Sequence, residues 1–258
     1  MIQAKQEQWH RQWEIFRDDE LFLFEEWIAP NTLEDFRGKE VLECGCGGGQ
    51  HTSFTAPYAK SITAVDLNTV DLARKKNADL SNAEFIEADI MSMDLGKKFD
   101  IVFSIGVLQH TDNPDRAFEN IKRHLRPAGR LIVWVYSAEG NSLVKYILEP
   151  VRKLLFNRMN RDILLQLSKA LTFLMYIPVY SIYLLPLEFL PYYEYFTNFR
   201  RLSFNRNCLN VFDKLNAPQV TFIDKEKVYG WFNPNEFKDI HISSYKGVSW
   251  RASGIKNG

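Results

Sequence analysis

Cysteine is scarce in this chain, with only Cys44, Cys46 and Cys208 among 258 residues. So small and odd a number excludes a disulfide framework. Met1 is followed by a polar, charged stretch and not by an apolar secretion signal, so we expect a reduced, cytoplasmic location. Neither sign of charge is in excess, since 32 basic side chains balance 32 acidic ones. The chain therefore lacks the overall positive charge that attracts nucleic acid, and we predict no specific nucleic-acid partner.

Long apolar runs are also rare, and residues 170–187 are the exception. This stretch, ALTFLMYIPVYSIYLLPL, carries no charged side chain over 18 residues and so has the length of a membrane span. Two prolines and three tyrosines interrupt it, which favours a helical lid over a straight span. Contact with a membrane surface and a true span remain alternatives, because basic residues flank the run: Arg152, Lys153, Arg158, Arg161, Arg200 and Arg201.

Short apolar runs alternate with amphipathic segments through the first half of the chain. The runs that predict strands are 39–44, 61–66, 83–89, 99–106 and 129–136. Between them, 69–80 and 114–125 have the pattern of helices. Strands that alternate with helices indicate a parallel sheet that binds ligands at the carboxyl ends of its strands. Further on, 236–246 and 248–256 predict an antiparallel hairpin.

Four glycines follow the first predicted strand in the segment VLECGCGGGQ, residues 41–50. Glycine allows a ligand to approach the backbone closely, and the helix that follows offers unpaired N–H groups. A metal site is the weaker interpretation, because Cys44 and Cys46 are two residues apart and no second cysteine pair lies nearby. A plain loop is the other alternative. We therefore interpret the segment as a nucleotide-binding loop.

The spacing of the glycines separates two kinds of nucleotide. A dinucleotide fingerprint requires a third glycine where this chain has Gln50, and the pattern here is E-x-G-x-G-x-G. Glu43, which ends the strand, would face a pyrophosphate unfavourably but suits a cationic amino acid group. The pattern favours S-adenosylmethionine over NAD.

At this point the chain resembles the class I S-adenosylmethionine-dependent methyltransferases, in a bacterial branch similar to types 11 and 12. The resemblance covers residues 39–137, and NVFDKLNAP through VYGWF, residues 210–232, adds a further likeness. It implies an α/β, Rossmann-like fold with a mostly parallel seven-stranded sheet and helices on both faces. A C-terminal antiparallel hairpin and a helical lid after the fifth strand complete the expected fold.

The resemblance also implies a set of residues that bind the cofactor. AVDLN places Asp66 at the ribose hydroxyls, and IEADI places Asp89 and the Ile90 backbone at the adenine. Each acid alone could instead cap a helix or a turn, but three acids at successive strand ends in the required order favour a site. The full set is Glu43, Gly45, Cys46, Gly47, Gly49, Asp66, Leu67, Asp89, Ile90, Ser104, Ile105 and Gly106.

Methyl transfer is a direct displacement, so the protein mainly aligns the reacting atoms, and a base is needed only for some acceptors. His110, after the fourth strand, is our candidate for that base, and a packed loop histidine is the alternative. Tyr136 and His10 are further candidates for the acceptor site. Trp13 and Phe16, on one face of an N-terminal helix, are expected to cover the cofactor or to pack in the core.

The expected units are a covering helix over 1–30, a cofactor-binding core over 31–141, a lid over 142–204 and a C-terminal completion of the sheet over 205–258. We expect methyl transfer to oxygen, or to nitrogen, of a small or lipid-linked metabolite, with S-adenosylhomocysteine as product and no metal. Residues 170–187 would contact a membrane only peripherally. The alternatives are an NAD-dependent oxidoreductase and a non-catalytic, membrane-associated module. Lid residues expected to face the acceptor are Leu174, Tyr176, Tyr180, Tyr183 and Phe189.

Overall fold

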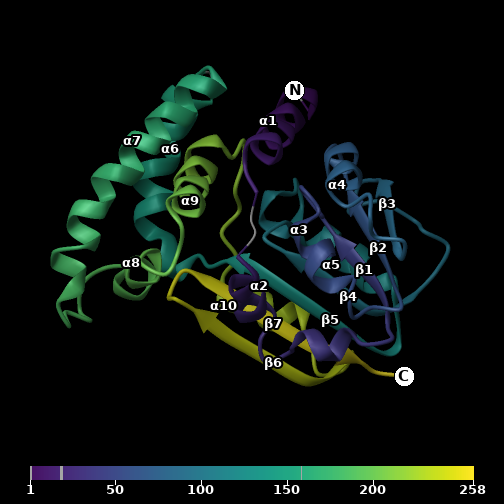
Figure 1. Ribbon diagram of the computed structural model, residues 1–258. Coiled ribbons are helices and arrows are strands. Elements are labelled where there is room, and N and C mark those ends of the chain that lie inside the picture. The colour runs from purple at the N-terminus through teal and green to yellow at the C-terminus, as the bar shows by residue number, and fades with distance from the viewer. Residues whose placement is uncertain (1, 18–19, 158) are drawn as a thin grey trace.

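A computed structural model of the chain describes residues 2–17, 20–157 and 159–258. Its described part contains one seven-stranded sheet in the order β3-β2-β1-β4-β5-β7-β6 (Figure 1). The predicted strands are all confirmed, with small changes at their ends. They are β1 Glu40–Cys44, β2 Ser61–Asp66, β3 Ala83–Glu87, β4 Phe99–Ile105, β5 Leu125–Tyr136, β6 Phe237–Tyr245 and β7 Ser249–Lys256.

Strands β1 to β5 pair in parallel, and β7 enters the sheet antiparallel between β5 and β6. The hairpin that joins β6 to β7 turns at Lys246 and Gly247, which have φ angles of 51° and 67°. This left-handed backbone matches the twist of a two-residue hairpin turn and suits glycine at the second position. The predicted fold class, a mostly parallel α/β sheet with a C-terminal hairpin, is therefore confirmed.

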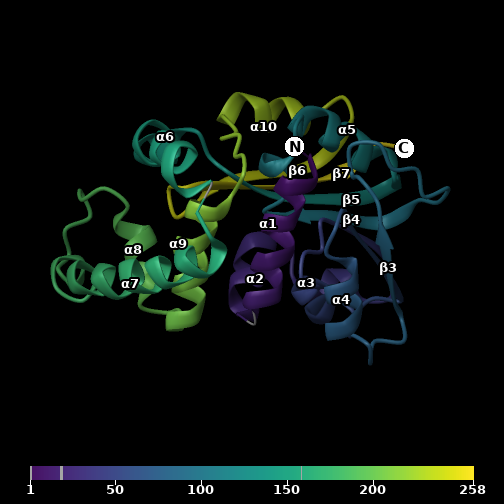
Figure 2. The same cartoon turned by 90° about the horizontal axis from the view of Figure 1, so that it is seen from above.

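Helices cover both faces of the sheet, as Figure 2 shows from above. Helices α5 (Pro114–Arg123) and α10 (Lys225–Trp231) lie on one face, and α2 (Leu21–Ile28) and α3 (Gln50–Thr55) on the other, with α4 (Val70–Lys76) beside β3. Helix α5 illustrates how the sequence sets an element. The Asn113 side chain accepts a hydrogen bond from Arg116 N at its start, and Phe118 and Ile121 are buried against the sheet.

A second group of helices lies beside the sheet, at the left of Figure 1. The predicted lid segment, 142–204, contains π-helical turns Val144–Leu148 and Arg152–Phe156 around α6 (Glu149–Val151), then α7 (Arg161–Val179), a short 3-10 helix Ile182–Leu184 and α8 (Tyr193–Phe199). Helix α7 is long and apolar enough to cross a membrane by length and composition alone. Pro178 lies in its last turn. Arg158, one of the flanking basic residues, lies outside the described residues.

The helical group includes elements on both sides of the expected lid. Helix α9 (Phe204–Asn216) packs against α7, and α1 (Ile2–Ile15) joins them. Phe16, Leu164 and Phe212 are buried together in this separate cluster, and the rings of Phe16 and Phe212 lie 5.4 Å apart. The single N-terminal helix expected over 1–30 is therefore wrong, because α1 packs on α9 whereas α2 packs on the sheet.

Candidate active site

The glycine loop runs from the end of β1 to the start of α3, at the carboxyl edge of the sheet. Gly45, Gly47 and Gly49 have positive φ angles of 85°, 52° and 80°. A Cβ on Gly45 would lie 2.4 Å from the Val107 side chain, and one on Gly47 would lie 2.8 Å from Trp13. Only glycine fits at either position, and both glycines line a cavity of about 720 Å³.

Gly49 and the two cysteines of the loop serve packing. A Cβ on Gly49 would lie 2.3 Å from the amide of Asn77, and Gly49 is not on the cavity wall. Cys44 and Cys46 are free and buried, and the Cys46 side chain packs beside Ala64. Among the described residues no group of acids, histidines and cysteines could hold a metal ion. Cys46 could therefore meet a ligand only through its backbone.

Asp66 ends β2 on the cavity wall and is tied to the glycine loop. One oxygen of its carboxylate accepts a hydrogen bond of 2.9 Å from Gly47 N, and the other accepts one of 3.2 Å from Asn68 N. Leu67 lies next to it with 41% of its surface exposed. A carboxylate that already orders the loop can still accept from a diol, because each oxygen has two lone pairs.

The ends of the next strands supply the rest of this wall. Asp89 and Ile90 follow β3 and line the cavity, and Asp89 accepts a hydrogen bond of 2.8 Å from Met91 N. Ile105 and Gly106 end β4 on the same wall. The carboxyl ends of neighbouring parallel strands meet at one edge, which brings these residues together as predicted.

Two predicted residues, Glu43 and Ser104, lie beneath the wall. Ser104 is fully buried and donates to the carbonyl of Cys44. Glu43 is 1% exposed and accepts a short hydrogen bond from Thr52, while its other oxygen lies 3.6 Å from His51 Nδ1 and has no hydrogen-bond partner among the described residues. Burial raises the pKa of Glu43 to about 8, although the Thr52 hydrogen bond opposes the rise. Glu43 therefore lies beneath the glycine loop and not on the cavity wall.

His110 stands on the opposite side of the cavity, at the end of the short 3-10 helix Leu108–His110. Its Nδ1 lies 3.0 Å from the carbonyl oxygen of Gln219, to which it donates in the neutral form. Because Nδ1 carries the proton, the free lone pair of the neutral ring is on Nε2. Burial lowers the pKa of His110, and Asp213 and the Gln219 carbonyl oppose this. The imidazole ring packs between Trp9, 4.7 Å away, and Tyr136, 5.7 Å away.

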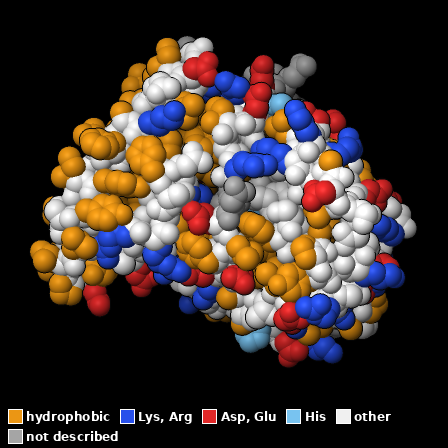
Figure 3. All heavy atoms as spheres, in the orientation of Figure 1, with side chains coloured by type: hydrophobic (Ala, Val, Ile, Leu, Met, Phe, Trp, Pro, Cys, Tyr) orange, Lys and Arg blue, Asp and Glu red, His pale blue; other side chains and the backbone are white. Residues whose placement is uncertain are grey.

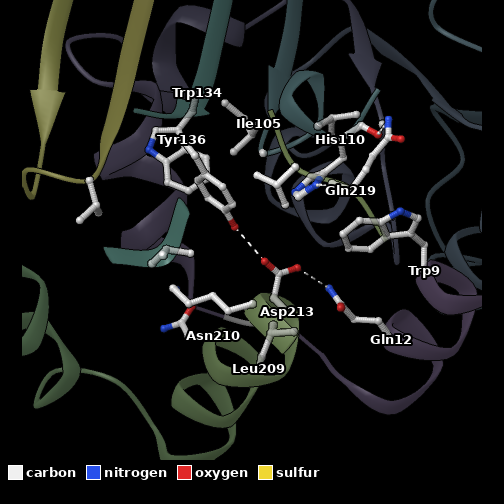
Figure 4. Close-up of a pocket in the computed structure, with 18 of the residues that line it drawn as sticks. Trp9, Gln12, Ile105, His110, Trp134, Tyr136, Leu209, Asn210, Asp213 and Gln219 are labelled. Carbon is white, nitrogen blue, oxygen red and sulfur yellow. Dashed lines mark hydrogen bonds between the residues drawn. The ribbon is translucent and has the colours of Figure 1, made fainter. Parts of the chain in front are cut away.

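Tyr136 ends β5 and connects the sheet to the helical group. Its hydroxyl donates a hydrogen bond of 2.9 Å to Asp213 of α9, and the amide of Gln12 on α1 donates one of 3.0 Å to the other oxygen of Asp213 (Figure 4). Gln12 in turn accepts from Asn216. Burial, with Asp213 beside the hydroxyl, holds the pKa of Tyr136 well above its usual value, so Tyr136 is a neutral hydrogen-bond donor and not a base.

The expected lid closes the cavity with residues other than those predicted. None of Leu174, Tyr176, Tyr180, Tyr183 and Phe189 lies on the cavity wall, and Phe189 is 81% exposed. The prediction was wrong because apolar character does not mark the inner side of α7, which buries Ser168 and Thr172 and exposes Phe173. The other predicted residues lie beyond its end at Val179: Tyr180, Tyr183 and Phe189. Lid residues that do line the cavity include Ile147, Leu148, Met175, Tyr192, Tyr195 and Phe196.

Of the residues predicted near the N-terminus, too, only some lie on the cavity wall. Trp13 lines the cavity, whereas Phe16 is buried among the helices. His10 is not on the wall, and its Nε2 lies 3.3 Å from an oxygen of Asp71 on α4.

Sequence reasoning did not find the charged residues contributed by the helical group. Asp213, Arg152 and Arg206 all line the cavity. The signal available for Asp213 was its place in the segment NVFDKLNAP, 210–218, which resembled the family without assigning a role to the acid. Arg152 stood out only as one of several basic residues near an apolar run.

Comparison with known proteins agrees with this geometry. Residues 42–133 match the family model described as "Methyltransferase domain", of type 11. The chain is 33% identical over 122 residues to a tRNA U34 carboxymethyltransferase of Idiomarina loihiensis, covering 44% of this chain and 38% of that protein. It is 32% identical over 104 residues to the mitochondrial ubiquinone biosynthesis O-methyltransferase of Schizosaccharomyces pombe, covering 38% of each. The chain thus spans well under half the length of these curated relatives.

Solved structures extend the likeness to nearly the whole chain. Magnesium protoporphyrin IX methyltransferase from Synechocystis, with bound S-adenosylhomocysteine, is similar with a TM-score of 0.55 and 12% identity, covering 97% of this chain and 94% of that one. At this identity the likeness concerns the fold. The family match over residues 42–133, and not the likeness of fold, favours the methyltransferase interpretation over the oxidoreductase.

The buried carboxyl of Glu43 makes a pH-dependent stability testable. In the unfolded chain Glu43 titrates near 4.5, whereas in the folded protein it titrates near 8. Between these values the native state binds more protons, so the contribution of Glu43 to stability falls as the pH rises. We expect Glu43→Gln to be more stable than the wild type at pH 8, and this advantage to shrink by more than about 1.4 kcal/mol on going to pH 5.

Urea unfolding of the ligand-free proteins between pH 5 and pH 8 measures the difference. Glu87→Gln, an acid on β3, is the control and should show no comparable trend. A pH-independent difference for Glu43→Gln would mean that Glu43 is ionised in the native protein.

Proposed function

We propose that this chain, whose core is a class I S-adenosylmethionine-dependent methyltransferase domain, transfers a methyl group to oxygen of a small or lipid-linked metabolite. One observation carries the proposal: a glycine loop and two strand-end acids line one wall of a cavity whose other wall holds a neutral histidine. The ubiquinone biosynthesis O-methyltransferase among the relatives supports oxygen as the acceptor atom, with nitrogen as the second candidate.

The residues present fit the proposed cofactor. Gly45 and Gly47 leave a cradle that a Cβ would fill, Asp66 offers a carboxylate to a ribose diol, and Asp89 with Ile90 lies at the place for an adenine. When bound, S-adenosylmethionine supplies an electrophilic methyl group on a sulfonium, and S-adenosylhomocysteine is the product. Trp13, packed over Gly47, would exclude water from this side.

His110 would act on the acceptor. With Nδ1–H donating to Gln219, the Nε2 lone pair can take the proton of an acceptor hydroxyl as the new oxygen–carbon bond forms. Its lowered pKa keeps the imidazole neutral and ready to accept at neutral pH. Trp9, through a tilted ring contact, and Tyr136, through an edge-to-face contact, hold the orientation of the ring.

The shape of the helical group supports a lipid-linked or otherwise apolar acceptor. Leu143, Ile147 and Val151 line the cavity and are also 50%, 60% and 38% exposed, so one helical stripe runs from the cavity to the surface. Further exposed apolar side chains lie on the same group, which Figure 3 shows gathered at the left of the molecule. They are Tyr146, Leu154, Leu155, Ile163, Phe173, Leu174, Ile177 and Phe189.

The same surface supports peripheral contact with a membrane, and a cytoplasmic location is a further part of the proposal. A tRNA acceptor, suggested by the name of one relative, is less favoured here, because the chain carries no net charge and the lid wall of the cavity is largely apolar.

Removal of the Asp66 carboxylate, which we propose binds the ribose hydroxyls, tests the cofactor site. We expect Asp66→Ala to weaken binding of S-adenosylhomocysteine by roughly 1–3 kcal/mol, the cost of a charge-assisted hydrogen bond left unmade. Isothermal titration calorimetry measures it, with circular dichroism to check folding. Asp79→Ala, an exposed acid away from the cavity, is the control. Wild-type protein that binds NADH, or that binds no S-adenosylhomocysteine, would contradict the proposal.

Loss of the base should affect turnover more than binding. Labelled S-adenosylmethionine incubated with fractionated lipid and metabolite extracts identifies an acceptor, and on it His110→Ala should turn over about 10²–10⁴-fold more slowly. Affinity for S-adenosylhomocysteine should stay within about twofold, and wild-type turnover should fall only below the usual titration range of histidine, since the pKa of His110 is lowered.

The exposed His241→Ala is the matched control and should behave as wild type. A His110→Ala variant with wild-type turnover at every pH would leave His110 as a residue that only lines the cavity.

The membrane contact can be tested on α7. We expect the wild-type protein to float with vesicles of phosphatidylcholine and phosphatidylglycerol, and the double variant Phe173→Ser with Ile177→Ser to float several-fold less, because both side chains lie on one exposed face. Tyr229→Ser, on α10, is the control for an exposed apolar residue elsewhere. A protein that ignores vesicles contradicts peripheral contact, and one that needs detergent for extraction from membranes indicates a span.

A further inference from the structure

Arg152 is buried in the helical group with most of its hydrogen-bond donors unpaired in the part of the chain that the structure describes. It lies on the cavity wall at the start of the turn Arg152–Phe156 and is only 2% exposed. Neither Nε nor one terminal nitrogen of its guanidinium has a partner among the described residues. The nearest carboxylate, Glu149, lies 3.6 Å away and is itself paired with Lys153 at 2.7 Å. A guanidinium has five N–H donors, so most of its capacity is unused.

An unpaired buried charge is costly unless something compensates for it. Burial lowers the pKa of Arg152, while Glu149 and Asp213 oppose the shift. Among the described residues the hydrogen bonds to the two oxygens of Asp213 come from Tyr136 and Gln12, and none comes from Arg152. Within residues 2–17, 20–157 and 159–258, the buried Arg152 cation thus has an ion pair with Glu149 at 3.6 Å but no hydrogen-bonded carboxylate.

The neighbouring residues of the helical group strengthen this positive charge. Of the described residues from 142 to 222 that line the cavity, Arg152, Arg206 and Lys214 are basic and Asp213 is acidic. Arg206 is 8% exposed and lies over the Trp27 ring, and Lys214 donates to the Tyr195 hydroxyl. Apolar and aromatic side chains surround them. The wall therefore combines an excess of positive charge with an apolar surface.

We propose that Arg152 binds a carboxylate or phosphate group of the acceptor. The apolar part of the acceptor then lies along the cavity wall that segment 142–204 contributes. This proposal rests on the proposed function, because the acceptor occupies the cavity of that site. It narrows the acceptor from any apolar metabolite to an anionic amphiphile. The planar guanidinium fork matches either oxyanion through two parallel hydrogen bonds.

Short-chain probes test the proposal without knowledge of the natural acceptor. Octyl phosphate, octanoate and octanol, each below its micelle-forming concentration, are titrated into the wild-type protein by calorimetry. We expect at least one of the two anions to bind roughly tenfold or more tightly than octanol, as a charge-assisted hydrogen bond implies. The stronger of the two anions identifies phosphate or carboxylate as the group.

Variants then assign the preference to Arg152. Arg152→Gln should reduce the ratio of anion to octanol affinity to within about twofold, and Arg152→Lys should retain part of it. Lys169→Gln removes an exposed positive charge of α7 that is away from the cavity wall and should leave the ratio unchanged. Equal binding of all three probes by the folded wild-type protein would overturn the proposal, whether or not the Arg152 variants fold. So would a preference that survives in Arg152→Gln.

A parallel titration with S-adenosylhomocysteine separates this proposal from the proposed function. Binding of S-adenosylhomocysteine without any anion preference removes only the oxyanion site. Anion preference that depends on Arg152, without binding of S-adenosylhomocysteine, removes the methyltransferase function and leaves an anion-binding cavity.

Discussion

The arrangement of the cavity depends on the hydrogen bonds that the Asp213 carboxylate accepts. It accepts hydrogen bonds from Tyr136 at the end of β5 and from Gln12 on α1, and Gln12 accepts from Asn216 one turn further along α9. A sheet strand, an N-terminal helix and a helix beyond the lid thus meet at one side chain. Because a buried carboxylate is costly to leave unpaired, these partners hold the helical group against the sheet edge.

The sheet edge explains why the chemistry gathers where it does. Parallel strands end at the same side, so Asp66, Asp89 and Gly106 come together although they are separated in sequence. The hydrogen bond from Gly47 N to Asp66 then fixes the glycine loop relative to the second strand. A core of this kind positions a cofactor but leaves its reactive end open to solvent, and the helical group closes that end.

Sequence reasoning succeeded where local pattern determines structure. The alternation of apolar runs gave the strands, and the order of acids at strand ends placed Asp66 and Asp89 on the wall. It failed for the residues predicted to face the acceptor because apolar character does not mark the inner side of this segment, in which Leu174 and Phe189 are 55% and 81% exposed. Asp213 could not be assigned, since its partners Tyr136 and Gln12 come from distant segments and only the fold brings them together.

The helical group also affects the pKa of His110, the proposed base. Burial lowers the pKa of both His110 and Arg152, and Asp213 opposes the change at both sites. A second negative charge placed beside Arg152 would act on His110 in the same direction as Asp213, because a nearby negative charge favours the protonated, cationic imidazole. An anionic acceptor would thus raise the proton affinity of the base that it needs, and a neutral acceptor of the same shape would not.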